Sequence, residues 1–245
     1  MNQRLSTWLL FGALLVSPLT ARGQETIGSM ARRTILYAPS FKTDDLSQTS
    51  RGTGPSVSAR KLSIPESARS AYSKGIHRLS KNDPAGSVVH FQRATSRFPT
   101  FYEAYYAMGI AQLTLGHAEE TQQAFQKSIE ASNGLYAEPH FGLSALLCNQ
   151  QKFTEAEPII RKALELAPGS GPGHSTLAWA LLGLNRLDES EKNAQEALIL
   201  EPRLSLAHLV LASIYNRRGD DSAVLAELDA YLRLTSISMR SLRTE

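Results

Sequence analysis

The chain has 245 residues, 20% of them charged, and a formal net charge of +3 at pH 7. These values are ordinary for a globular protein, and the net charge is too small to indicate a partner among the nucleic acids. Cys148 is the one cysteine of the sequence, which excludes a framework of internal disulfides.

The N-terminal segment, residues 1–23, has the features of a secretory signal peptide. A positive charge at Arg4 precedes the apolar run Trp8–Val16, and small residues follow. The run has about half of the ~20 residues that a membrane-spanning helix needs. We therefore predict cleavage after Ala21 or Gly23 and no stable membrane insertion afterwards, and expect an exported protein, periplasmic or secreted. An uncleaved anchor is the alternative.

Residues 24–64 are rich in Ser, Thr, Gly and Arg and show no sustained hydrophobic period. Such a composition predicts a flexible linker. Pro65 and Glu66 then favour the start of a helix, because proline fits its first turn and an acidic side chain interacts well with the N-terminal end of its dipole.

The remaining chain repeats the same residue types every 34 residues. Ala163 and Ala197 have this separation, as do Pro168 and Pro202. With Tyr136 as a one-residue insertion, five units follow one another without a gap: 68–101, 102–135, 137–170, 171–204 and 205–238. Each unit has two apolar helical stripes separated by a polar break, which predicts a helix-turn-helix that buries its apolar face only against a neighbour.

Two positions within the unit indicate how its helices pack. Position 8, on the first helix, is small in every unit: Gly75, Gly109, Ser144, Ala178 and Ala212. Position 24, on the second helix, is more often large: Phe91, Phe125, Ile160, Ala194 and Leu228. A small side chain at a helix crossing permits close approach, and a bulky side chain fills the adjacent space.

This pattern resembles the tetratricopeptide repeat (TPR), and the resemblance covers about 70% of the chain. It is strongest at three groups of residues: Phe91, Ala94 and Pro99; Tyr105, Met108, Gly109 and Phe125; and Leu143, Ala156, Ala163 and Pro168. The resemblance implies an all-α, right-handed α-solenoid of five helix-turn-helix units. The N-terminal part of the chain together with the repeats is similar to exported bacterial TPR proteins. A C-terminal tail, residues 239–245, follows the array.

The resemblance also implies a concave groove lined by the first helices, with ligand contacts at positions 2, 5, 9, 12 and 13. The groove residues that we single out are Tyr72, Ile76, Tyr106, Ile110, Leu113, Phe141, Asn149, Trp179, Leu209, Asn216 and Arg217. Such an apolar and aromatic lining suits an extended or helical peptide with apolar anchors. The alternative is that several of these aromatic residues only pack between repeats.

The sequence contains none of the common catalytic or phosphate-binding motifs. His140, His174 and His208 all occupy position 4, but equivalent residues of adjacent repeats lie about 8–10 Å apart, too far for shared zinc ligands. We therefore predict packing roles for these histidines and expect no metal, no cofactor and no catalytic residue.

Three functions are compatible with these features of the sequence. The leading one is a non-enzymatic interaction module or scaffold of the cell envelope that binds a peptide or protein partner in the groove. The alternative is a structural assembly factor of an envelope or secretion complex that contacts partners through the ends of the stack. The second helix of the fifth unit would then meet a partner or another copy of the chain, because terminal repeats expose an apolar face. An enzyme or a cofactor-binding subunit is the third and least favoured.

Overall fold

The computed structural model describes the backbone of residues 63–241 and the side chains of residues 63–235, and this part of the chain is entirely helical, without strands. Its helices, in chain order, are α5 (Glu66–Ser80), α6 (Pro84–Arg97), α7 (Tyr102–Leu115), α8 (Ala118–Ala131), α9 (Ala137–Asn149), α10 (Phe153–Leu166), α11 (Gly171–Gly183), α12 (Leu187–Leu200), α13 (Ser205–Arg218) and α14 (Asp221–Ser241). The predicted signal peptide and nearly all of the predicted linker lie outside the described residues.

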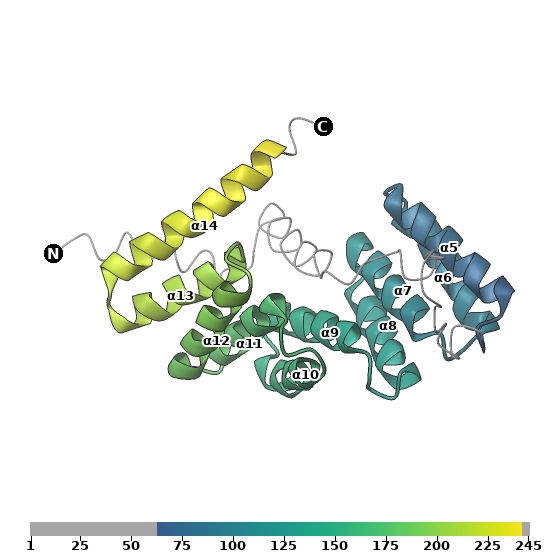
Figure 1. Cartoon of the computed structure of the whole chain (residues 1–245), viewed down its shortest axis with the longest axis horizontal. Helices are drawn as coiled ribbons and strands as arrows, with labels where there is room; N and C mark the ends of the chain where they lie inside the picture. The colour runs from purple at the N-terminus through teal and green to yellow at the C-terminus, as the bar shows by residue number, and fades with distance from the viewer. Residues whose placement is uncertain (1–62, 242–245) are drawn as a thin grey trace, which may run out of the picture.

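Consecutive helices pair into hairpins, and each hairpin corresponds to one predicted unit. The hairpins stack side by side into an arc, with α5 at one end and α14 at the other (Figure 1). The predicted all-α solenoid is therefore confirmed. Its core is a series of apolar clusters between successive helices, as expected where each repeat contacts only its neighbours.

The small residue at position 8 lies against the large one at position 24 in the first two units. A Cβ added to Gly75 would lie 2.5 Å from a ring carbon of Phe91, and a Cβ added to Gly109 would lie 2.5 Å from one of Phe125. Both phenylalanine side chains are fully buried. Because the two helices of a unit approach each other closely here, the residues at positions 8 and 24 cannot both be large.

Position 15, the turn between the two helices of a unit, has a left-handed backbone in every unit. The residues are Asn82, Gly116, Gln151, Asn185 and Gly219, with φ between 57° and 82°. Glycine and asparagine adopt this conformation most easily. The sequence signal was therefore present at four of these positions, and Gln151 is the exception.

The two ends of the array differ from the predicted boundaries in detail. Ile64, the last residue of the predicted linker, is 2% exposed and packs with Ala68 and Phe101. At the other end, α14 has 21 residues and continues into the predicted tail 239–245. Ser236 stands at the unit position where Pro168 and Pro202 follow α10 and α12, so the residue that would end the helix is missing.

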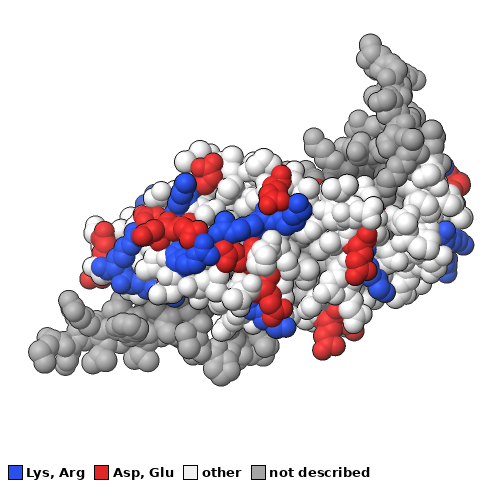
Figure 2. Space-filling model, turned by 90° about the horizontal axis from the view of Figure 1, so that it is seen from below, with Lys and Arg blue, Asp and Glu red and all other residues white. Residues whose placement is uncertain are grey.

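Ion pairs connect the last three units on the outer side of the arc. Figure 2 shows alternating basic and acidic side chains over this half of the face, with few charges over the other half. Arg186 contacts Glu157 of α10 at 2.6 Å and Glu189 of α12 at 2.6 Å. Arg218 of α13 contacts Glu191 of α12 at 2.5 Å. These pairs add contacts between repeats to those of the apolar core.

Candidate interaction surfaces

The predicted groove residues all lie on the first helices of the units, and we call this set the first-helix face. Their burial differs widely. Those with partly exposed side chains are Tyr72, Ile76, Leu113, Phe141, Asn149, Trp179, Leu209 and Asn216, while Arg217 is exposed. Tyr106 and Ile110 are only 4% and 1% exposed and belong to the core between units two and three. The accessible part of the face is thus smaller than the predicted set.

An aromatic cluster surrounds the N-terminal part of the face. The ring of Tyr72 lies 5.0 Å from that of Phe101, between centroids. The ring of Tyr106 lies 5.6 Å from that of Tyr136, and Tyr136 lies 4.9 Å from Tyr102. Sequence reasoning treated Tyr136 only as an insertion, although an aromatic residue next to the first helix of a unit could have indicated a place in this cluster.

Burial raises the pKa values of three of these tyrosines well above the usual range. Burial is the main cause for Tyr72, Tyr106 and Tyr136, and a carboxylate adds to it: Glu103 for Tyr72, and Glu138 for Tyr106 and Tyr136. The three hydroxyls therefore stay protonated at physiological pH and can serve as hydrogen-bond donors.

The middle and C-terminal parts of the face contain three large apolar side chains, those of Phe141, Trp179 and Leu209. Phe141 packs against Gly173 of the next unit, where an added Cβ would lie 2.5 Å from its ring. Trp179 packs against two core clusters, one on each side of its unit. Leu209 is half-buried. Phe141 and Trp179 therefore contribute to the packing of the array as well as to the face.

The polar residues of the face have different partners. Asn149 donates a hydrogen bond from Nδ2 to the carbonyl oxygen of Ala145 at 3.1 Å. Its Oδ1 is buried and has no hydrogen-bond partner among the described residues. Arg217 donates to the carbonyl oxygen of Leu182 and to Oδ1 of Asn185 at 3.2 and 3.0 Å. Arg217 thus links α13 to the end of α11, whereas Asn149 keeps an unused acceptor.

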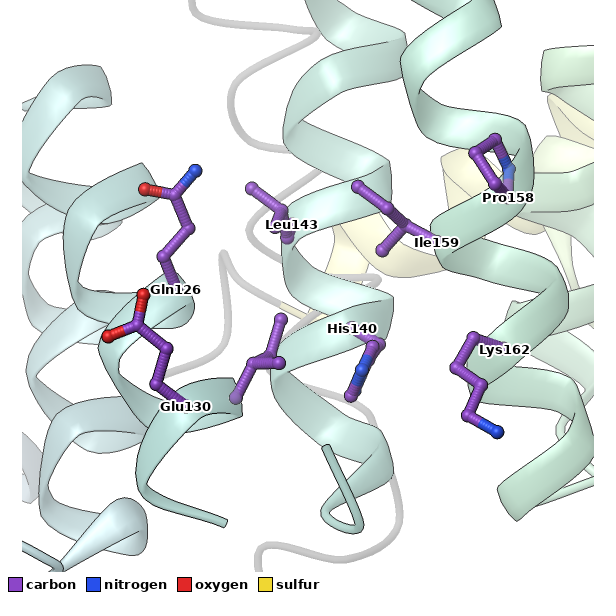
Figure 3. Close-up of a pocket in the computed structure, with 8 residues that line it drawn as sticks. Gln126, Glu130, His140, Leu143, Pro158, Ile159 and Lys162 are labelled. Carbon is purple, nitrogen blue, oxygen red and sulfur yellow. The ribbon is translucent and has the colours of Figure 1, made fainter. Parts of the chain in front are cut away.

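A pocket of about 560 Å³ lies between units two and three (Figure 3). Figure 3 shows α8 on one side, α10 on the other and α9 between them. The lining residues are Gln126, Ile129 and Glu130 of α8, His140 and Leu143 of α9, and Pro158, Ile159 and Lys162 of α10. Sequence reasoning missed this pocket, because no pattern in the repeat marks the space between two second helices.

The three histidines at position 4 each have separate hydrogen-bond partners. Nδ1 of His140 lies 2.9 Å from the carbonyl oxygen of Tyr136. Nδ1 of His174 lies 3.1 Å from Oδ1 of Asn193. Nδ1 of His208 lies 2.7 Å from the Glu227 carboxylate. Nδ1 of each histidine therefore has its hydrogen-bond partner within its own unit or, for His140, in the residue that immediately precedes its unit.

Two features are absent from the part of the chain that the structure describes. Between residues 63 and 241, no helix is long and apolar enough to cross a membrane. The same part of the chain contains no group of three or more His, Cys, Asp or Glu side chains arranged to hold a metal ion.

Two family models match the chain, both described as tetratricopeptide repeat, at residues 102–134 and 175–236. One curated relative, the inactive TPR repeat-containing thioredoxin TTL3 of Arabidopsis thaliana, is 40% identical over 68 residues. That match covers 28% of this chain and 10% of the relative, so this chain corresponds to a small part of that protein.

Solved structures share the fold over most of the array. The structure of MamA, residue 41 to the end, from Desulfovibrio magneticus RS-1 has a TM-score of 0.62 and 18% identity, and covers 71% of this chain and 97% of that one. YrrB, described as a TPR protein with an unusual peptide-binding site, has a TM-score of 0.58 and 18% identity, with 72% and 91% covered. TTC0263, a thermophilic TPR protein of Thermus thermophilus, has a TM-score of 0.53 and 20% identity, with 70% and 99% covered. At these identities the likeness shows the fold alone.

Proposed function

The chain is a tetratricopeptide repeat protein, a fold of protein–protein interaction modules, and we propose that its first-helix face binds a peptide or a protein segment. The partner would place apolar side chains against the partly exposed residues of that face, such as Leu113, Trp179 and Leu209. A segment of this kind binds through a few buried apolar anchors, while the surrounding contacts mainly exclude water.

The partly exposed apolar side chains of the first-helix face are the observation that carries this proposal. Each of the five units contributes one of them: Ile76, Leu113, Phe141, Trp179 and Leu209. A bound segment would cover this apolar surface at several points along the array, and burial of apolar area favours binding.

We place this activity outside the cytoplasm, in the periplasm or in the secreted fraction. The support is the sequence of residues 1–23, with its short apolar run after Arg4. Sequencing the N-terminus of the processed protein tests this placement. An intact N-terminus would favour the uncleaved anchor instead. The competing function, a structural assembly factor, would use the ends of the stack rather than the first-helix face.

The test compares variants of the first-helix face with a variant on a second helix. Leu113→Ser and Leu209→Ser each remove an apolar contact of the face, so we expect weaker binding. Val89→Ser is the matched control, because Val89 is 53% exposed and lies on α6, a second helix.

The assay is affinity capture from an envelope extract by the processed protein, followed by direct titration of each captured partner. We expect Leu113→Ser and Leu209→Ser to weaken binding while Val89→Ser leaves it unchanged, with all three variants folded by circular dichroism. If both face variants bind with full affinity, the proposed use of the first-helix face is wrong. Loss of binding only in variants at the ends of the stack would support the assembly-factor function.

A further inference from the structure

The last helix, α14, exposes large apolar residues, and one of them has an equivalent in the preceding unit that is covered. Leu198 of α12 is half-buried and packs on the cluster that contains Val210 and Leu211 of α13. Leu232 occupies the same unit position 34 residues later and is 61% exposed. Leu225, on the same helix, is 69% exposed. A helix lying along α14 as α13 lies along α12 would cover these side chains.

The spacing of these residues is that of a helix–helix seam. Leu225, Leu228 and Leu232 follow one another at intervals of three and four, and in the sequence Thr235 and Met239 continue the alternation. Apolar residues at alternating intervals of three and four form the contact line between two paired helices. The whole of α14, with 21 residues, is about 30 Å long, and the line from Leu225 to Leu232 takes up about 10 Å of it. In Figure 1 α14 continues past the end of α13.

The charges along α14 favour one orientation of a paired helix. Asp221 and Asp229 lie in its N-terminal half and Arg233 lies in its C-terminal half. Glu227 contacts His208 of α13, and Arg233 contacts Asp229 at 2.7 Å within α14. Two such helices that run antiparallel place the acidic half of one beside the basic half of the other. Parallel helices would place like charges together. The helix is thus complementary to an inverted copy of itself.

We propose that two copies of this chain pair through their α14 helices, antiparallel and across Leu225, Leu228 and Leu232. The pairing is isologous: the same patch is used on both copies, and Leu228, at the centre of the seam, lies near the two-fold axis. This contact is separate from the first-helix face, so each copy would keep its own binding face. A partner with two binding segments could then engage both copies at once.

The first experiment measures the mass of the full chain by light scattering and sedimentation equilibrium over a range of concentrations. We expect a monomer–dimer equilibrium that Leu232→Asp shifts toward monomer, with a dissociation constant raised about 30-fold or more. Ile199→Asp is the matched control, because Ile199 is a 74% exposed apolar residue on α12 and is not part of the seam. Circular dichroism checks that both variants keep their helix content.

The second experiment tests the orientation by disulfide cross-linking. Leu225→Cys and Leu232→Cys are made in separate proteins, which are then mixed and oxidised. Antiparallel pairing predicts disulfides between the two different variants, whereas parallel pairing predicts disulfides within each. A monomer at every concentration, a dimer unaffected by Leu232→Asp, or disulfides only between identical variants would each overturn the proposal.

Discussion

Replacing Gly109 by alanine tests the pairing of positions 8 and 24 on which the stack depends. An alanine Cβ would lie 2.5 and 2.6 Å from two ring carbons of Phe125, whereas carbon atoms in favourable contact are about 3.5–4.0 Å apart. About 1 Å must therefore be gained between α7 and α8. The ring cannot simply move away, because a Cβ on Gly142 of α9 would lie 2.7 Å from its other side.

Two opposing effects determine how much Gly109→Ala changes the free energy of unfolding. Overpacking of a well-packed core typically costs about 1–3 kcal/mol, while alanine gains about 1 kcal/mol over glycine in helix propensity. Because Phe125 is fully buried and held between two glycines, the overpacking cost should lie in the upper part of its range. We expect a net loss of about 1–2 kcal/mol in the free energy of unfolding, and a melting temperature lower by about 2–8 °C.

A double-mutant cycle separates this effect from a general loss of stability. Phe125→Leu alone should destabilise the protein by leaving a cavity. In the double variant the alanine methyl occupies part of that space, so the combined loss should be smaller than the sum of the single losses by about 0.5–3 kcal/mol. Urea unfolding followed by circular dichroism measures all three variants. Strictly additive losses, or a stabilised Gly109→Ala, would show that position 8 does not face position 24.

Two further predictions concern a turn and the ion pairs of the outer face. Gln151 has a left-handed backbone with φ of 59°, so Gln151→Gly should raise the free energy of unfolding by up to about 1 kcal/mol. Gln150 has φ of −84°, so the control variant Gln150→Gly should not be stabilised. Thermal melts measure both variants. Burial raises the pKa of Glu157, but hydrogen bonds from Arg161 and Arg186 outweigh it and hold the value below the usual range. A lowered folded-state pKa contributes stability above the unfolded-state value, and this contribution is lost as the pH falls through the folded-state value. Arg186→Met should therefore lower the free energy of unfolding slightly near neutral pH and reduce the loss of stability on acidification below about pH 4.5. Urea titrations at a series of pH values measure both effects, and an unchanged acid dependence would contradict this role of the ion pair.

The accessible face of the array could be predicted only in part, because exposure depends on neighbouring repeats. Tyr72 and Tyr106 occupy the same unit position, yet Tyr72 is partly exposed and Tyr106 is buried. The ring of Tyr136, the inserted residue, lies against Tyr106 and covers part of its side chain. A single insertion between units two and three thus changes the environment of a residue whose unit position is unchanged.

The sequence alone determined the number of units, their order and the packing of each hairpin. These features follow from the period of 34 residues and from small residues at position 8, such as Gly75 and Gly109, because each unit buries its apolar stripes mainly against its own second helix and its nearest neighbour. What the tertiary structure decided is how neighbouring units meet. The pocket between α8 and α10, the unpaired oxygen of Asn149 and the exposed seam of α14 each depend on side chains from different helices, or on a neighbouring helix that does not cover them. A repeat pattern specifies positions within a unit, and it does not specify the spaces between units.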